Sequence, residues 1–179
     1  MVAWLTTMED KYRKEPWLDP RLELGPSPIH GQGTFATALI DAGEVVVVWG
    51  GTFANFEEAQ RARALGKLTM QVDDDLYTVE ERGEHASYFM NHSCDPSVWM
   101  WDALTLVARR GIAPGGELTL DYALFEADDD FTMPWECTCG SPICRKRITG
   151  RDWRRPYLQQ RYAGHFLPLI GRRIARPRR

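Results

Sequence analysis

The stretch FMNHSCDP, residues 89–96, places an amide, an imidazole, a hydroxyl and a thiol in four consecutive positions and ends in a proline. The whole chain contains four histidines and four cysteines, and one residue of each type stands in this stretch. Proline fixes its own φ angle and restricts the residue before it, so the stretch ends in an extended or turn conformation. A segment of this composition is a candidate metal or ligand site.

The cysteines link this stretch to a second segment, WECTCGSPICRKR at residues 135–147. That segment holds a C-x-C-x4-C cluster formed by Cys137, Cys139 and Cys144. Structural zinc sites use four thiolate or imidazole ligands in a tetrahedron, so the cluster is one ligand short. Cys94 offers the fourth thiol, although three histidines are alternative donors: His85, His92 and His165. Closely spaced cysteines in a loop with glycine and proline suit a metal better than a packed core, so we expect one structural zinc.

Composition indicates one ordinary globular domain. The chain has 179 residues, of which 44% are hydrophobic and 26% are charged, enough for a single full core. Apolar runs stay well short of the roughly 20 residues that a membrane span needs, and the N-terminus does not resemble a signal peptide. We therefore expect a protein that is not secreted, has no membrane partner and forms no disulfides. It would be cytoplasmic if bacterial, and nuclear or cytoplasmic if eukaryotic.

Charge is unevenly distributed along the chain. The formal net charge is −3, which disfavours a general nucleic-acid binder. Residues 73–75 and 128–130 are runs of three aspartates, and residues 171–179 contain five arginines. Each run is typical of a solvated face or tail. The acidic runs have a second interpretation, the attraction of a basic substrate segment.

Local patterns predict a mainly β protein with a few short helices. Five short segments rich in β-branched or alternating apolar residues are bounded by turn-forming residues: 34–39, 44–49, 76–79, 104–108 and 117–120. One helix is expected from Asn55, with Glu58 completing a capping box and Gly66 as the stop. A second helix is expected to begin at Pro156 and to end at Gly164.

Four motifs, in order along the chain, resemble the SET-domain family of protein-lysine methyltransferases. Residues 89–96 resemble the family pattern F-x-N-H-S-C-x-P, and ELTLDY at 117–122 resembles E-L-T-x-D-Y. GQGTFA at 31–36 resembles G-x-G-x-F/V-A, and residues 137–144 resemble the post-SET cysteine cluster. The resemblance runs from about residue 29 to about residue 144 and favours a compact bacterial member.

The resemblance implies a SET-domain fold, or β-clip, of small curled β-sheets. In that fold the segment 117–122 passes near 89–96 in a knot-like threading, an exception to the usual connection rules. The implied organisation has four parts: an N-terminal flanking segment over 1–28, a SET domain over 29–135, a post-SET zinc-binding segment over 136–150, and a C-terminal helical extension with a basic tail over 151–179.

The resemblance also implies the roles of individual residues. Six would contact S-adenosylmethionine: Gln32, Gly33, Thr34, Phe89, Asn91 and His92. Gln32 and Thr34 would do so through backbone groups, because the neighbouring glycines permit close approach. One zinc ion would be shared by Cys94, Cys137, Cys139 and Cys144. Tyr122 would be the catalytic residue, its hydroxyl orienting the amine of the substrate lysine. The alternatives are a turn-forming amide at Asn91, a core histidine at His92 and a core tyrosine at Tyr122.

The sequence departs from the family at four positions. Tyr88 stands where many members have arginine, and this departure affects one polar contact to the cofactor. Ser97 stands where members usually have asparagine, which concerns a turn. Leu120 takes a position often held by phenylalanine that is thought to tune the number of methyl groups added, and Trp99 lies near another such position. The number of methyl groups transferred is therefore open.

Methyl transfer from a sulfonium to a lysine amine needs an aligned and neutral amine. Alignment of reacting groups can contribute about 7–11 kcal/mol. Lysine has a pKa of about 10.4 in water, and an apolar aromatic channel lowers it by desolvation. Nine aromatic residues in or near the motifs are candidates for lining such a channel: Tyr77, Phe89, Trp99, Trp101, Tyr122, Phe125, Phe131, Trp135 and Trp153.

Three functions from different classes follow. The leading hypothesis is an S-adenosylmethionine-dependent protein-lysine N-methyltransferase with a structural zinc, whose partner is a histone or another basic protein. The second is a SET-fold protein-binding module without turnover. The third, a zinc-stabilised nucleic-acid binder using the arginine tail, would bind with a steep salt dependence, and no specific nucleic-acid partner is expected. The joint presence of Asn91, His92 and Tyr122 favours the enzyme.

Overall fold

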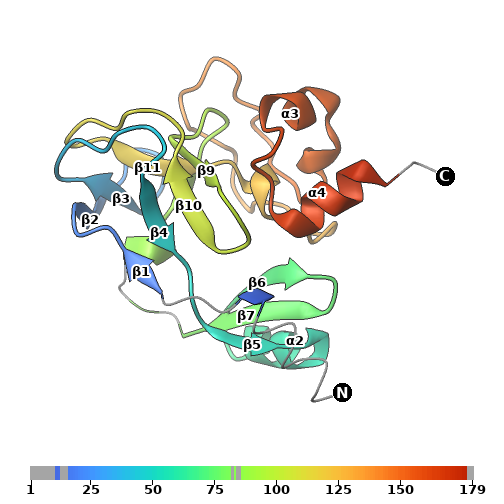
Figure 1. Cartoon of the computed structure of the whole chain (residues 1–179). Helices are drawn as coiled ribbons and strands as arrows, with labels where there is room; N and C mark the ends of the chain where they lie inside the picture. The colour runs from blue at the N-terminus through green and yellow to red at the C-terminus, as the bar shows by residue number, and fades with distance from the viewer. Residues whose placement is uncertain (1–10, 13–15, 82, 84–85, 177–179) are drawn as a thin grey trace.

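The computed structural model describes residues 11–12, 16–81, 83 and 86–176. Within these ranges the chain forms three small β-sheets with short helices beside them (Figure 1). The strands are β1 Trp17–Leu18, β2 Leu22–Pro26, β3 Gln32–Ala36, β4 Val45–Val48, β5 Thr52–Ala54, β6 Leu68–Asp73, β7 Leu76–Glu80, β8 Asn91–His92, β9 Val98–Met100, β10 Thr105–Ala108 and β11 Glu117–Leu120. The α-helices are α2 Phe56–Ala64, α3 Pro156–Arg161 and α4 Pro168–Ala175, and the 3-10 helices are η1 Ala86–Tyr88, η2 Tyr122–Leu124 and η3 Asp152–Arg154.

Strand β11 joins the two motifs that the sequence places far apart. One four-stranded sheet has the order β1-β4-β10-β9, the other has the order β2-β3-β11-β8, and the third sheet is β5-β7-β6. β11 pairs antiparallel with β3 and parallel with β8, so Leu118 lies opposite Thr34 and Thr119 opposite Asn91. The expected proximity of 117–122 and 89–96 is confirmed. The knot-like threading is consistent with this pairing and stays a prediction.

The expected β content is confirmed, with small shifts at the strand ends. The strand over 117–120 is observed with those bounds, and the other four expected strands overlap β3, β4, β7 and β10. Six strands were not predicted: β1, β2, β5, β6, β8 and β9. Several of these are only two or three residues long, so their sequences carry too few alternations to be read as a period-two pattern.

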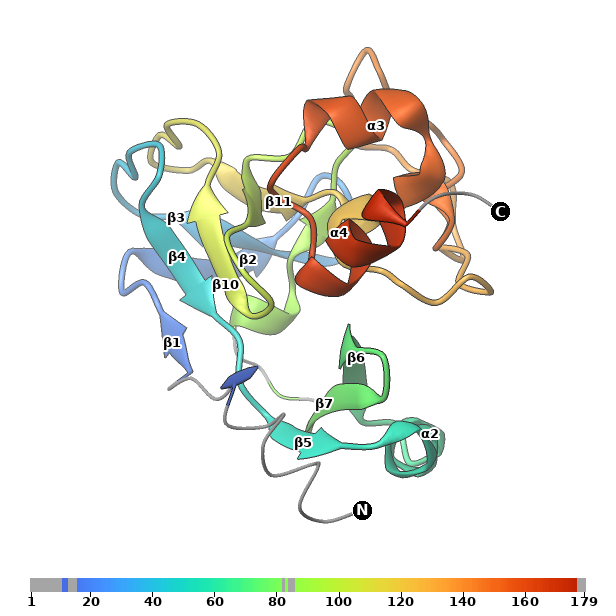
Figure 2. The ribbon, with the colours of Figure 1, turned by 45° about the vertical axis from the view of Figure 1, so that its right-hand side comes forward.

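The expected capping box of α2 is present. The Asn55 side chain accepts a hydrogen bond from the Glu58 N–H over 3.0 Å, and the Glu58 carboxylate accepts one from the Asn55 N–H over 2.9 Å. Both bonds satisfy N–H groups that the first turn of a helix leaves without partners. α2 packs beside the sheet β5-β7-β6, and together they form one end of the molecule, apart from the two four-stranded sheets (Figure 2).

The C-terminal extension is part of the fold. α3 begins at Pro156, as expected, and ends at Arg161, before the predicted stop at Gly164. α4 extends to Ala175, so Arg172 and Arg173 of the arginine run are helical and half-buried, Arg176 is exposed, and residues 177–179 lie outside the described residues. Leu169 and Ile170 of α4 are almost fully buried and belong to the main hydrophobic core. None of the helices in the described ranges has the length and apolar character needed to cross a membrane.

One hydrophobic core unites the sheets with the extension. It contains Val46 of β4, Leu106 of β10 and Leu118 of β11 together with Leu158 and Tyr162 of the extension, all with an exposed fraction of 0%. Full burial of one such aliphatic side chain contributes about 1.5–3 kcal/mol. The motif-bearing strands therefore depend for their packing on residues beyond the matched motifs.

Candidate functional site

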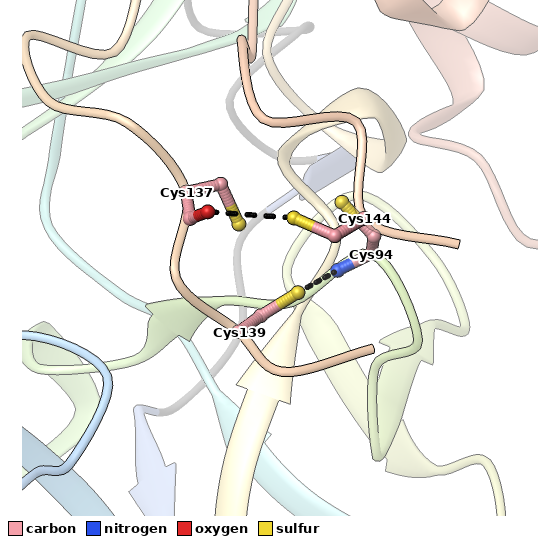
Figure 3. Close-up of side chains that lie close together, drawn as sticks. All are labelled: Cys94, Cys137, Cys139 and Cys144. Atoms are coloured by element: carbon pink, nitrogen blue, oxygen red, sulfur yellow. Dashed lines mark hydrogen bonds between the residues drawn. The ribbon is translucent and has the colours of Figure 1, made fainter. Parts of the chain in front are cut away.

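The four cysteines converge to form a candidate metal centre. Cys94 follows β8, and the other three come from the loop 137–144, with all four sulfurs within 4.8 Å of one another (Figure 3). In tetrahedral zinc sites the metal lies about 2.3 Å from each sulfur, which places the sulfurs about 3.8 Å apart. Four thiolates at this spacing fit one zinc ion. The expected donor set is brought together without a histidine, and the cluster can hold a metal ion.

The alternative histidine donors lie elsewhere or have other partners. The His165 ring stacks on Trp99, with ring centroids 3.4 Å apart, and its Nδ1 lies 3.1 Å from the Met100 carbonyl oxygen. His92 touches the cluster as a neighbour, its Nε2 lying 3.3 Å from the Cys94 Sγ. His85 lies outside the described residues. The geometry therefore favours a four-cysteine centre.

The thiols sit in unlike electrostatic surroundings. Burial raises the pKa of the Cys94 thiol to about 12, although the backbone N–H of Arg145 partly offsets this. Burial also raises the pKa of Cys137. At Cys139 burial acts in the same direction, but hydrogen bonds that include the Cys94 N–H, at 3.5 Å, lower the pKa to about 7. Four clustered thiolates, two of them buried, need a compensating cation, so we expect metal binding and deprotonation of this cluster to occur together.

We expect the purified protein to contain one zinc ion per chain, because the four sulfurs form a closed donor set. Elemental analysis of protein dialysed against buffer without chelator measures this content. Protein with no bound metal would contradict the prediction. So would four thiols that all react freely with a thiol reagent in the native state.

Asn91 of β8 anchors the glycine-rich loop, residues 30–32, through hydrogen bonds. Its Nδ2 donates to the carbonyl oxygens of His30, at 3.1 Å, and Gln32, at 2.9 Å. The same nitrogen lies 2.8 Å from Glu117 Oε1. A Cβ atom at Gly33 would lie only 2.4 Å from that oxygen, so any larger residue there would displace the Glu117 carboxylate. The asparagine therefore fixes the loop backbone that is predicted to face the cofactor.

Five of the six predicted cofactor residues lie on β3 and β8, the two strands that flank β11, and Phe89 lies two residues before β8. Thr34 is buried in β3, and its hydroxyl donates to the carbonyl oxygen of Phe89 over 3.4 Å. Gln32 is exposed at the start of β3, and Asn91 and His92 form β8. The structure thus brings all six residues to adjoining segments. Their contacts with a cofactor stay a prediction.

The His92 side chain points into the protein. Its Nδ1 accepts a hydrogen bond from the Tyr122 N–H over 3.2 Å, so the ring proton resides on Nε2, which faces the Cys94 Sγ at 3.3 Å. Burial lowers the pKa of His92 to about 4, with Asp121 acting weakly in the opposite direction, and the ring is neutral at pH 7. A cofactor contact by His92 would therefore use its backbone.

Tyr122 opens η2 directly after β11. Its ring packs edge-on against His92, at 5.1 Å between centroids, and against Phe125, at 5.5 Å. Its hydroxyl donates to the Met90 carbonyl oxygen over 3.3 Å. Burial raises the pKa of Tyr122 to about 12, so the phenol keeps its proton at neutral pH. With the proton directed at Met90, the phenol oxygen can accept a hydrogen bond from another donor.

Tyr122 borders a cavity of about 230 Å³ with largely apolar walls. Its principal lining side chains are Trp49, Met70, Met90, Leu120, Tyr122 and Phe125. Trp49 and Phe125 contact each other edge-on, with centroids 5.7 Å apart. Trp49 was missed by the sequence analysis, because it follows β4 outside every motif. Two of the nine expected aromatic residues, Tyr122 and Phe125, line this cavity.

The two clearest departures from the family pattern have partners in the structure. The Ser97 hydroxyl accepts a hydrogen bond from the Thr119 N–H over 2.8 Å and donates to the Glu117 carbonyl oxygen over 3.1 Å. Ser97 therefore secures the turn after residues 91–94 against β11. Tyr88 lines the cavity together with Glu80. Burial is the main cause that raises the pKa of Tyr88 to about 12, and its hydrogen bond to Glu80 acts in the same direction.

The acidic runs are engaged in pairs within the chain. Buried Asp73 accepts hydrogen bonds from Tyr12 and from Arg172 of α4. In the second run, three arginines pair with the three aspartates: Arg63 with Asp128, Arg154 with Asp129, and Arg151 with Asp130. Asp73 is thus part of the packed fold, whereas Asp74, Asp75 and Asp130 are exposed, as expected of a solvated face.

Comparisons with known proteins agree with this arrangement. Residues 31–123 match the family described as SET domain. The chain is 34% identical over 156 residues to histone-lysine N-methyltransferase trithorax of Drosophila virilis, covering 79% of this chain and 4% of that protein. It is 32% identical over 141 residues to the H3 lysine-4 specific histone-lysine N-methyltransferase of Mycosarcoma maydis, covering 70% of this chain and 10% of that protein. It is 31% identical over 134 residues to human histone-lysine N-methyltransferase 2B, covering 67% of this chain and 5% of that protein. The chain thus spans a small part of each of these relatives.

Proposed function

The chain belongs to the SET-domain family, and from this premise we propose that it is an S-adenosylmethionine-dependent protein-lysine N-methyltransferase. The observation that carries the proposal is the largely apolar cavity that Tyr122, Trp49 and Phe125 line. A lysine side chain has the length and the apolar stem to enter such a cavity. The three similar proteins named above are histone-lysine N-methyltransferases, which supports a histone or another basic protein as the substrate.

The residues around the glycine-rich loop fit a cofactor. S-adenosylmethionine supplies the methyl group on a positively charged sulfur. Gly31 and Gln32 are exposed, and Gly31 has a φ of 52°, with open space around its Cβ position. This loop is held by Asn91, and the segment 88–92 beside it leads to the cavity that Tyr88 and Tyr122 line. We propose that backbone groups of Gln32 and Thr34, together with Phe89, Asn91 and His92, hold the cofactor there.

The cavity can prepare the amine for reaction. Desolvation by Trp49, Phe125 and the neighbouring methionines disfavours an ammonium ion and lowers the pKa of an entering lysine. The aromatic faces stabilise a methylammonium product by roughly 0.5–2 kcal/mol per contact. The Tyr122 oxygen accepts a hydrogen bond from the neutral amine, which orients the nitrogen and leaves its lone pair free.

We further propose that zinc is the metal of the four-cysteine centre and that its role is structural. The supporting observation is the position of Cys94, which lies three residues after Asn91 and directly follows the segment predicted to hold the cofactor. All four donors come from the protein, so the site is closed, as structural zinc sites are.

Asn91→Ala should weaken S-adenosylmethionine binding by about tenfold or more, because the loop 30–32 loses its side-chain anchor. Isothermal calorimetry on the zinc-loaded protein measures the affinity. The matched control is Asn55→Ala, which removes the cap of α2, remote from the loop, and should leave the affinity unchanged. Unchanged affinity in folded Asn91→Ala would remove this residue from the cofactor site.

The function itself is tested by methyl transfer. The protein is incubated with radiolabelled S-adenosylmethionine and either histones or a lysate of its own organism, and labelled proteins are identified by mass spectrometry. We expect label on lysine side chains of one or a few proteins. A protein that binds the cofactor but labels neither set of acceptors would support the binding module instead.

A further inference from the structure

A buried arginine connects the metal centre to the turn that carries Tyr122. Arg145 directly follows Cys144, and its side chain is only 5% exposed. Its two terminal nitrogens bond both carboxylate oxygens of Asp121, at 2.7 and 2.6 Å. Asp121 is fully buried and directly precedes Tyr122. The bidentate pair therefore acts on the residue beside the proposed catalytic tyrosine.

Asp121 controls how the chain turns after β11. Its Oδ1 accepts a hydrogen bond from the Ala123 N–H over 3.0 Å, which caps the 3-10 helix η2 beginning at Tyr122. A cap of this kind selects one backbone path at the start of a helical turn. The direction of the Tyr122 side chain depends on that path, so it depends on where the Asp121 carboxylate is held.

Arg145 also touches the metal centre and the C-terminal extension. Its backbone N–H donates to the Cys94 Sγ over 3.2 Å. Its Nε donates to Asp152 of η3 over 2.9 Å. The extension reaches the same carboxylate directly, because the Tyr162 hydroxyl donates to Asp121 Oδ2 over 3.1 Å. The four-cysteine centre, the C-terminal extension and the turn that carries Tyr122 thus all contact one residue, Arg145.

The chemistry of this position suits arginine and not lysine. The guanidinium is planar, keeps its charge, and can give two parallel bonds to Asp121 while a third goes to Asp152. An ammonium offers a point charge without this fork. Loss of the guanidinium would leave two buried carboxylates short of partners, and Asp121 would then shift to regain solvation or other donors.

We propose that Arg145 is a positioning residue for Tyr122, through which the four-cysteine centre and the C-terminal extension hold the catalytic turn in place. The proposal rests on the proposed function for the role of Tyr122, but its structural part stands on the contacts of Asp121. Arg145 itself is buried behind the turn and would act only through Asp121 and η2.

The first test is hydrogen exchange measured by mass spectrometry on zinc-loaded Arg145→Met. We expect exchange in peptides covering η2 to rise about tenfold, because local opening of the turn becomes easier, while strand β10 keeps its protection and zinc content is unchanged. The control is Arg147→Met, an exposed arginine two residues away. Unchanged exchange at η2 would overturn the proposal, as would an equal rise in β10, which reports general destabilisation.

The second test is kinetic. Arg145→Met should lower kcat about tenfold or more with the dissociation constant of S-adenosylmethionine within about twofold, since misplacement of a reacting group affects turnover more than ground-state binding. Arg145→Lys should recover only part of the loss. Equal kcat in wild type and folded Arg145→Met would refute the positioning role. Absence of transfer by the wild type would count against the proposed function, and the exchange result would still decide the structural part.

If Arg145→Met does not fold, Arg145→Lys replaces it in both tests. This change keeps the positive charge and removes the two parallel bonds to Asp121. We expect faster exchange at η2 and a severalfold fall in kcat, with β10 and zinc content unchanged. No change at η2 in this variant would overturn the proposal.

Discussion

Replacing Tyr122 by phenylalanine should lower methyl transfer about 100-fold, which corresponds to roughly 2.7 kcal/mol of transition-state stabilisation. The variant loses one oxygen and keeps the ring that packs against His92 and Phe125. The lost hydroxyl belongs to a residue that lines the cavity and donates to the Met90 carbonyl, and it is the group proposed to accept a hydrogen bond from the amine.

The fold and the cofactor affinity of this variant should change little. Removal of the single bond to Met90 costs about 0.5–1.5 kcal/mol of unfolding free energy. S-adenosylmethionine affinity should stay within about twofold, because the hydroxyl acts on the transition state and not on ground-state cofactor binding. The measurements are steady-state kinetics with a lysine-bearing acceptor, calorimetry and thermal unfolding.

Tyr157→Phe is the matched control, since Tyr157 is 49% exposed on α3 and should be silent in all three measurements. Equal turnover of wild type and Tyr122→Phe would strip Tyr122 of its assigned role. A loss of cofactor affinity as large as the loss of turnover would assign the hydroxyl to binding instead.

Cys94→Ser should abolish stoichiometric zinc binding and also weaken S-adenosylmethionine binding by about tenfold or more. Cys94 is the predicted ligand that would join residues 91–94 to the loop 137–144, and its sulfur also contacts Arg145 N–H and His92 Nε2. Without the metal, β8 loses its anchor at one end, and the loop that Asn91 holds loses its fixed position.

Elemental analysis, calorimetry and thermal unfolding measure these effects. Ile143→Ala is the control, because Ile143 is 46% exposed in the same loop, next to Cys144, and supplies no ligand. We expect the control to keep one zinc and wild-type affinity. A Cys94→Ser protein that lacks zinc yet binds the cofactor normally would show that the two sites are independent.

The sequence alone predicted the features that depend on local hydrogen bonds and on residue type. The capping box of Asn55 and Glu58 involves residues three apart, and the start of α3 at Pro156 depends on the fixed φ of one residue. Counting predicted that the three thiols of the second segment need a fourth ligand, which Cys94 or one of three histidines could supply.

The resemblance to the family predicted that residues 89–96 and 117–122 lie close together, and the structure showed which strands bring them together. The parallel pairing of Thr119 with Asn91 joins strands of four and two residues across a separation that no local pattern records. Strand β8 exists only because β11 lies beside it. Short strands of this kind acquire their hydrogen bonds from the tertiary fold and not from their own propensity.

Only the tertiary structure revealed the parts of the site that lie outside the motifs. Trp49 joins the cavity wall because β4 ends beside Phe125. Arg145 bonds Asp121 because the chain after the loop 137–144 lies against Cys94. Arg172 and Arg173 of the arginine run lie on α4, which packs into the core through Leu169 and Ile170, and Arg172 pairs with buried Asp73. Each of these contacts joins residues distant in the chain, and burial of apolar and paired charged groups in one shared core determines which of them meet.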